Sequence, residues 1–306
     1  MIELQRKLLG DKVRNDAFHA ALKKVIKKGE STVLDLGSGT GFLSFLASRL
    51  GAKHTTLIEF GDIVDTSEKL ARRNKIKNLT FIHAHSTDVP TSEKYDVVVS
   101  ETLGNYALEE NIIESMEDAK RFLKKGGVMI PGKIAQFVCP VVSDRLWKDI
   151  DVWETGFDID FTEAKQIANN NMYVKTVKSS DLLPGGEEKW DTVDFSKPVK
   201  SVRSADLTWT LKKPQTVYGL AVWWEAELVP GVTLSTSPSA KTTHWEQIFL
   251  PLLEPIDCKA NDEFSLKLVS DTRYEIKVNL SWKVTHKRGG KVIDIQEMDM
   301  RQGYLA

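Results

Sequence analysis

Cysteine is scarce in this chain. Its 306 residues contain only Cys139 and Cys258. Two cysteines are too few for a disulfide framework, and their distant positions show no metal-ligand spacing. We therefore expect a protein that works in a reducing, cytoplasmic setting and holds no metal ion.

Long apolar runs are missing as well. No stretch reaches the length of about 18 apolar residues that a helix needs to cross a bilayer. The first residues, MIELQRKLLGDKVRNDAF, carry too many charges for the apolar core of a signal peptide. We expect a soluble protein without a membrane partner.

Neither sign of charge is in excess. The chain has 42 lysines and arginines against 43 aspartates and glutamates. This balance argues against a nonspecific nucleic-acid binder, whose affinity depends on neutralising many phosphates. The apolar share of 41% and the charged share of 28% are ordinary for a globular protein. The length predicts two subdomains.

Short β-branched runs alternate with amphipathic stretches in the first half. A charged helix is expected over about 2–28, followed by the runs TVLDL, TTLIE, LTFIH, YDVVVS and GGVMIPG. Further helices are expected at Phe42–Leu50, Ile63–Arg73 and about Ile112–Phe122. Strands that alternate with helices indicate βαβ units with a parallel sheet, that is, a doubly wound α/β domain.

The pattern changes near Ile134 to alternating apolar and polar residues. Runs such as YGLAVWWEAEL and EIKVNLSWKVTH predict an antiparallel sandwich or barrel. We place the boundary at Pro131-Gly132, which gives domains at 1–131 and 132–306. One stretch, Arg145 to Asn171, looks helical or loop-like where a sheet would otherwise continue, and we expect it to project as an arm.

A glycine loop, VLDLGSGTG, follows the first strand and carries Gly37, Gly39 and Gly41. Glycines allow a tight turn and close approach to a ligand, and the following helix offers free N–H groups. Glu59 ends the second strand 22 positions after Gly37, where a doubly wound fold presents a carboxylate to ribose hydroxyls. Asp35 suits a cationic or amine-bearing ligand better than a pyrophosphate.

These residues resemble the S-adenosylmethionine-dependent methyltransferases of the Rossmann-like class. The resemblance implies S-adenosyl-L-methionine as cofactor, bound by Asp35, the three glycines and Glu59. In that class the third strand ends beside the adenine, where HAHSTDVP stands here, so Ser86 or Thr87 would contact the base. An ordinary polar loop explains these two residues equally well.

An acidic loop, SETLGNYALEEN, follows the strand YDVVVS. Glu109 and Glu110 could simply favour the first turn of the helix at Ile112, because acidic residues complement the helix dipole. That interpretation does not account for Glu101 at the sheet edge. Nine positions separate Glu101 from Glu110, enough for both carboxylates to face one pocket. A guanidinium between them would relieve their repulsion and give paired hydrogen bonds.

A second loop in the β region contains Thr243, His244 and Trp245 at the head of a strand. Together with the glycine loop and the paired glutamates, it makes the chain resemble the protein arginine N-methyltransferase family over nearly its whole length. In that family the two loop glutamates clamp the substrate arginine, which implies this role for Glu101 and Glu110. The family's loop histidine corresponds to His244. Trp223, Trp224 and Trp245 are more often core or pocket wall than catalysts, and we expect Trp245 to contact the substrate.

The resemblance extends to the N-terminal segment LLGDKVRNDAF and to the arm. It implies that Arg14 holds the methionine carboxylate, that Asp11 faces His244, and that the arm at about 145–171 joins two copies into a homodimer. Asp11 and His244 would complete a catalytic set with the two glutamates. The partner expected from the family is an arginine-containing protein or peptide.

Some positions depart from the family. After the first glutamate it usually has Trp-Met-Gly-Tyr, where Thr102-Leu103-Gly104-Asn105 stand here, and Asn111-Ile112 replace its Ser-Met. Since Met1 lies only 13 positions before Arg14, we expect the tyrosine-rich lid helix of the family to be missing. Two alternatives stay open: a methyltransferase of the same fold that acts on a small molecule or another protein group, and a noncatalytic partner subunit.

Overall fold

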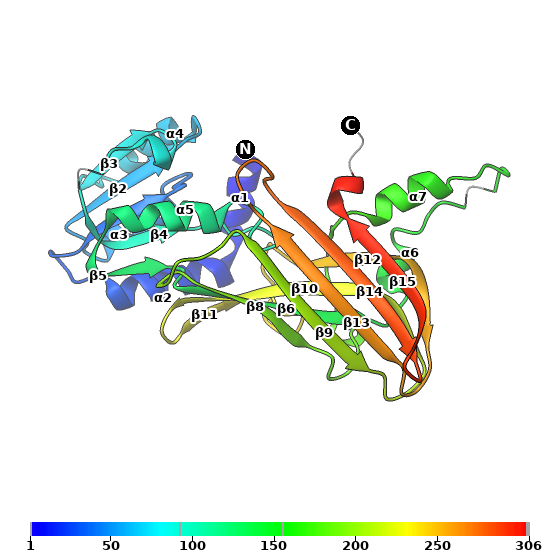
Figure 1. Ribbon diagram of the computed structural model, residues 1–306. Helices are drawn as coiled ribbons and strands as arrows, with labels where there is room; N and C mark the ends of the chain where they lie inside the picture. The colour runs from blue at the N-terminus through cyan, green and yellow to red at the C-terminus, as the bar shows by residue number, and fades with distance from the viewer. Residues whose placement is uncertain (1, 92, 155, 304–306) are drawn as a thin grey trace.

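The computed structural model describes residues 2–91, 93–154 and 156–303. It has an α/β part followed by a β part, which lie against each other (Figure 1). One cluster of buried apolar side chains runs through both parts, from Phe18 to Met300. The two parts are therefore packed on a shared core.

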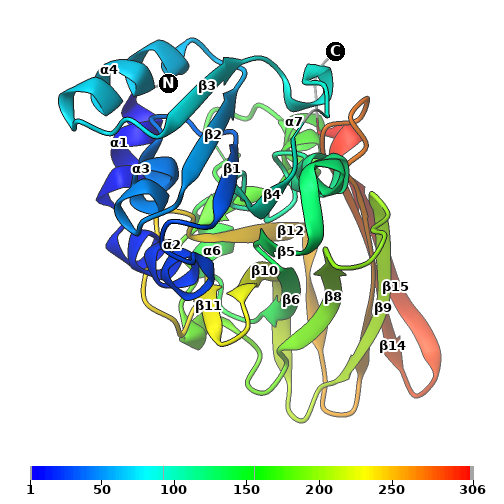
Figure 2. The same cartoon turned by 90° about the vertical axis from the view of Figure 1, so that its left-hand side faces the viewer.

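The α/β part is built on a five-stranded parallel sheet of order β3-β2-β1-β4-β5. Its strands are β1 (Thr32–Leu36), β2 (His54–Glu59), β3 (Leu79–His83), β4 (Tyr95–Ser100) and β5 (Leu123–Ile130). Its helices are α1 (Ile2–Gly10), α2 (Lys12–Val25), α3 (Phe42–Arg49), α4 (Ile63–Arg73) and α5 (Ile112–Ala119). Figure 2 shows α3 and α4 outside β1 and β2, with the β part on the opposite side. The predicted doubly wound α/β fold is confirmed.

Two helix predictions need correction. The single helix expected over 2–28 is two helices, because Asp11 interrupts it and caps α2 by accepting the Arg14 N–H at 2.9 Å. Gly10 is a poor helix former and aspartate is a strong N-cap, so the chain restarts there. The helix expected to reach Phe122 ends at Ala119 and continues as a 3-10 turn, Lys120–Phe122.

The β part consists of two antiparallel sheets. The six-stranded sheet contains β7 (Tyr173–Lys175), β12 (Gln247–Cys258), β10 (Gln215–Val229), β6 (Lys133–Val141) and β8 (Glu188–Asp194) in this order, with β11 (Val232–Ser235) paired to β10. The four-stranded sheet has the order β15 (Lys291–Asp299), β14 (Asn279–Arg288), β13 (Glu263–Asp271) and β9 (Val202–Thr210). Strand β8 lies against β9, and β12 against β15, so the sheets meet along both edges as in a flattened barrel.

The connection between the two parts is short. β5 ends the parallel sheet at Ile130, and β6 begins the first antiparallel sheet at Lys133. This change of sheet supports the proposed division at residues 131 and 132.

The arm interrupts the β part after β6. It contains α6 (Arg145–Lys148) and α7 (Thr162–Asn169), and Figure 1 shows α7 standing away from the sheets. Apolar side chains near its tip face solvent: Val152 is 70% exposed and Phe157 78%. Separately, no helix among the described residues is long and apolar enough to cross a membrane.

Candidate active site

A cavity of about 450 Å³ lies at the carboxyl ends of β1, β2 and β4, a size typical of small-molecule sites. Helix α1 borders it through Leu4, Gln5, Leu8 and Leu9. The residues predicted from the sequence that line this cavity are Arg14, Asp35, Gly37, Gly39, Glu59, Glu101, Glu110, His244 and Trp245. The fold thus brings the glycine loop, the acidic loop and the Thr-His-Trp loop to one place.

The glycine loop and Glu59 form one wall of the cavity. Glu59 accepts the Gly39 N–H at 2.8 Å and the Gly61 N–H at 2.7 Å. The Ser38 hydroxyl is buried without a hydrogen-bond partner among the described residues. A Cβ at Gly39 would lie 2.9 Å from the Gln5 side chain. This wall fits the polar sugar of a nucleoside ligand. It offers the unpaired Ser38 hydroxyl and the Glu59 carboxylate, beside glycines that have no side chains.

Asp35 is buried at the end of β1. It accepts a hydrogen bond from the Ser44 hydroxyl at 2.6 Å. Burial raises the pKa of Asp35 to about 7, against the opposing effect of the bonds from Ser44. A nearby cation would favour its ionised form.

Three predicted cofactor residues do not line the cavity. Gly41 begins α3 at φ +80°, where an added Cβ would collide with Ser67 and Phe45, so its glycine serves the packing of α3 against α4. Ser86 and Thr87 lie in a 3-10 turn, where Thr87 bonds the His85 ring at 2.7 Å. The expected contact of Ser86 or Thr87 with the adenine stays a prediction.

Glu101 is buried at the centre of the cavity, with its side chain 5% exposed. It accepts the Nε–H of Arg14 at 2.7 Å and an Nη2–H of the same guanidinium. Burial raises the pKa of Glu101, although Arg14 opposes this rise. Arg14, which the family resemblance assigns to the methionine carboxylate, is therefore paired here with one of the two glutamates expected to bind the substrate arginine.

Glu109 and Glu110 differ although they are neighbours. Glu109 accepts the Asn105 N–H at 2.9 Å and the Tyr106 N–H at 3.4 Å. Glu110 stays in contact with solvent at the cavity mouth, yet the surrounding protein atoms, then Glu101 and Glu109, raise its pKa to about 7. Neither lies in the first turn of α5, which begins at Ile112 and contains Glu114 as its acidic residue.

The β part holds the acidic loop in place. Trp245 donates its indole N–H to the Leu103 carbonyl at 2.6 Å, and Trp224 donates to the Gly104 carbonyl at 3.1 Å. The sequence interpretation gave these tryptophans only the role of core or pocket wall. The only sequence signal was the presence of these tryptophans in the β part, which does not identify the carbonyls that the indoles reach.

Asp11 and His244 are in contact. Asp11 Oδ2 accepts the His244 backbone N–H at 2.9 Å and lies 2.8 Å from His244 Nδ1. Burial lowers the pKa of His244, against the opposing effect of Asp11. If the neutral ring donates its Nδ1–H to Asp11, as this short distance indicates, Nε2 is left able to accept a proton.

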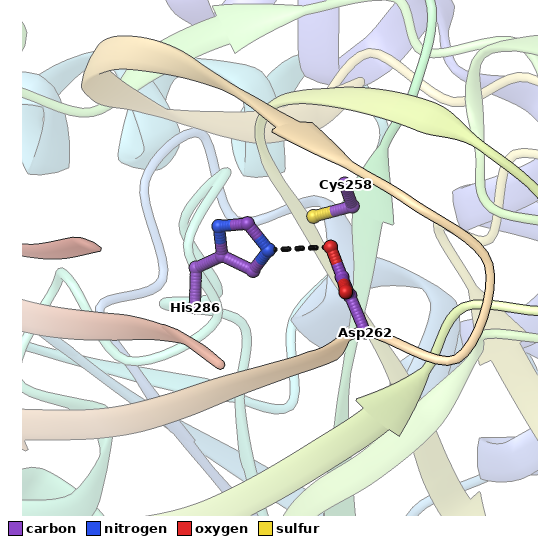
Figure 3. A group of neighbouring side chains, drawn as sticks. All are labelled: Cys258, Asp262 and His286. Carbon is purple, nitrogen blue, oxygen red and sulfur yellow. Dashed lines mark hydrogen bonds and ion pairs between the residues drawn. The ribbon is translucent and has the colours of Figure 1, made fainter. Parts of the chain in front are cut away.

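A second group of chemically active side chains lies in the β part (Figure 3). Cys258, Asp262 and His286 place their sulfur, oxygen and nitrogen atoms within 4.8 Å of one another, a proximity that the sequence spacing did not indicate. Asp262 already takes a hydrogen bond from Arg288 at 2.8 Å and another from the Lys259 N–H at 2.7 Å, and lies 2.7 Å from His286 Nε2. Arg288 therefore balances the charge of the Asp262 carboxylate.

Comparison with known protein families matches both parts of the chain. Residues 133–287 match the family described as "Arginine methyltransferase oligomerization subdomain", and residues 27–191 match "Methyltransferase domain". Among solved structures, the "Trypanosoma brucei PRMT1 enzyme-prozyme heterotetrameric complex with AdoHcy" has a TM-score of 0.86 at 21% identity, covering 97% of this chain and 98% of that one. Arabidopsis thaliana protein arginine methyltransferase 10 has a TM-score of 0.83 at 22% identity, covering 98% of each chain. At these identities the structures show the shared fold.

Curated relatives agree. A probable protein arginine N-methyltransferase 6.2 of Oryza sativa is 25% identical, over 94% of this chain and 81% of the relative. Protein arginine N-methyltransferase 1 of Saccharomyces cerevisiae is 24% identical, over 95% of this chain and 87% of the relative. The match to the oligomerization subdomain of arginine methyltransferases spans half of the sequence. This chain therefore belongs to the protein arginine N-methyltransferase family.

Proposed function

We propose that this protein transfers the methyl group of S-adenosyl-L-methionine to a guanidino nitrogen of arginine in a protein or peptide. The observation that carries the proposal is that Glu101 and Glu110 share one cavity with the glycine loop and Glu59. When bound, the cofactor would supply a methyl group on a cationic sulfur. Glu59, the glycine loop and Ser38 would hold its sugar, and Arg14 its carboxylate.

The two glutamates would act by position and charge. They would hold the guanidinium and draw its positive charge away from the reacting nitrogen, which makes that nitrogen more nucleophilic. Alignment of the reactants at about 3 to 3.5 Å, together with this charge placement, would provide most of the acceleration. Because arginine keeps its proton at neutral pH, a base must take one during or after transfer. Glu110 and the His244–Asp11 pair are the candidates.

Arg14 separates the roles of the two glutamates. It balances the charge of Glu101 within the cavity, whereas Glu110 has no cationic partner among the described residues. Glu110 therefore presents the unbalanced negative charge that a substrate guanidinium would neutralise.

Two observations support a proposal for the assembly. The β part carries the family's oligomerization subdomain, and the arm exposes Val152, Phe157 and Ile159. We propose a homodimer in which the apolar side chains on the arm of one copy are buried against the other copy. Closed symmetric dimers are the most frequent oligomers.

Glu110→Gln tests the proposed activity, because it keeps the size of the side chain and removes its charge. We expect the single-turnover rate on an arginine-rich peptide, at saturating cofactor, to fall by about two to three powers of ten, with S-adenosylhomocysteine affinity unchanged. Glu30→Gln, an exposed position in a turn outside the cavity, is the matched control.

Mass spectrometry of the product identifies the acceptor atom and thus separates arginine from the alternative acceptors. A Glu110→Gln rate above about a tenth of the wild-type rate would refute the clamp. A wild type that binds S-adenosylhomocysteine but methylates neither peptides nor small molecules would instead be a noncatalytic partner subunit.

A further inference from the structure

Glu109 has a set of contacts that the proposed mechanism does not use. Its two carboxylate oxygens accept the consecutive N–H groups of Asn105 and Tyr106, and its own N–H donates to the Tyr106 carbonyl at 2.9 Å. These bonds close the chain into a turn between the two clamp glutamates. The turn ends one residue before Glu110.

The turn is built around this carboxylate. A Cβ on Gly104 would collide with the Glu109 side chain, so only glycine leaves room for it there. Without the carboxylate, the N–H groups of Asn105 and Tyr106 would lose their acceptor in a part-buried site, which is costly. The far end of the loop is fixed separately, since the Asn111 side chain donates to the Thr272 carbonyl at 2.7 Å.

We propose that Glu109 is a positioning residue for methyl transfer, which closes the turn between Glu101 and Glu110 and adds a third negative charge beside the guanidinium site. This inference rests on the proposed function of the two glutamates. It also separates two neighbouring residues of the same type: the Glu109 carboxylate is engaged by backbone N–H groups, which leaves Glu110 as the one free to meet a substrate.

The charge of Glu109 acts on Glu110 directly. The charged and titratable groups that line the cavity with Glu110 are Arg14, Asp35, Glu59, Glu101, Glu109 and His244. Of these, Glu101 and Glu109 add to desolvation by the surrounding protein atoms in raising the pKa of Glu110. Glu110 must be ionised to hold a guanidinium, so activity is present above its pKa and is lost as the pH falls through it. Removing the charge of Glu109 lowers that pKa and extends activity to lower pH.

Two substitutions separate the hydrogen bonds from the charge. Glu109→Gln keeps an amide oxygen for the Asn105 N–H, whereas Glu109→Ala leaves both N–H groups without an acceptor. In Glu109→Gln we expect the acid limb of kcat/KM, which reports the free enzyme, to move to lower pH. In Glu109→Ala we expect kcat/KM to fall by about tenfold or more. Glu30→Gln should match the wild type in both measurements.

An acid limb of Glu109→Gln at the wild-type pH, or a wild-type kcat/KM in Glu109→Ala, overturns the proposal. Hydrogen exchange of the amides at 103–110 tests the positioning role without any activity. Glu109→Ala should exchange faster there than the wild type and Glu109→Gln, and equal rates in all three would also overturn it. The proposed function fails separately, if the wild type methylates no arginine.

Discussion

At the scale of single residues, the centre of the cavity is a buried ion pair. Arg14 and Glu101 are 6% and 5% exposed, so neither charge could stay in this site without the other. A carboxylate from a bound cofactor would become a second acceptor for Arg14. The same guanidinium would then contact both the cofactor and Glu101, one of the two glutamates proposed to bind the substrate.

The first prediction concerns the wall of the cavity formed by the glycine loop and Glu59. Gly39→Val adds a branched side chain at φ +52°, against Gln5, and Glu59→Ala removes the carboxylate proposed to bind the ribose. We expect each change to weaken S-adenosylhomocysteine binding by about ten- to a hundredfold in calorimetry. Gly185→Val is the control, because Gly185 has a similar φ of +69° with no atom within 4 Å of an added Cβ. Wild-type affinity in both variants would contradict the assignment of this wall.

At the scale of elements, the acidic loop belongs to the α/β part but is held by the β part. Trp224 lies on β10, and Trp245 precedes β12, so the antiparallel sheet positions two loop carbonyls. The pocket therefore depends on how the two parts pack. Neither part could form it alone.

Trp245→Phe tests this dependence. The variant keeps an aromatic ring and loses the N–H to Leu103, so the loop should loosen. We expect methyl transfer to fall about tenfold while S-adenosylhomocysteine affinity is kept. Trp282→Phe is the matched control: Trp282 is equally buried and donates to the Pro251 carbonyl at 2.9 Å within the β part. Equal activities in the two variants would argue against a role of Trp245 in the loop.

The Asp262 cluster connects the turn after β12 to strand β14. Asp262 follows β12, and its partners His286 and Arg288 lie on β14, so one carboxylate joins a turn to a strand. The hydrogen bond from Arg288 holds the pKa of Asp262 below its usual range, despite the opposing effect of burial.

Asp262→Asn should therefore lower the melting temperature in a pH-dependent way. A carboxyl whose pKa is depressed by folding stabilises the protein above its unfolded pKa of about 3.9, and loses this effect as the pH falls. The difference in melting temperature should be largest near neutral pH and shrink in acid. Equal melting temperatures at neutral pH would contradict a stabilising role, and Asp206→Asn, on β9 outside this cluster, is the control.

At the scale of the whole molecule, the proposed dimer depends on the arm. Its tip exposes Phe157 and Ile159, whereas Asn169 and Asn170 at its base bond the β part. Large apolar side chains gathered on a projecting segment indicate a surface that another chain covers. Substitution at the tip therefore disturbs the interface without loosening the fold.

Phe157→Ser with Ile159→Ser should convert a dimer into monomers with reduced methyl transfer. Sedimentation at micromolar concentration measures this directly. Val292→Ser with Ile293→Ser is the control, because these exposed apolar residues lie on β15 rather than on the arm. A wild type that sediments as a monomer would refute the proposed role of the arm.

The sequence by itself determined the order of strands and helices, the change from an α/β to a β part, and the positions of the glycine loop and Glu59. These features depend on residues close together in the chain, through periodicity, turn chemistry and the fixed geometry of a βα unit. Helix ends were less certain, as the break at Asp11 shows. Capping there competes with a continuous helical pattern.

Only the tertiary structure decided which side chains meet. Arg14 pairs with Glu101 across 87 positions, and Trp245 reaches Leu103 across 142. The different contacts of Glu109 and Glu110 depend on how one turn closes, and both Ser86 and Thr87 lie in a turn outside the cavity. A local pattern carries no information on such distant contacts, because they arise only when separate elements pack and buried polar groups must find partners.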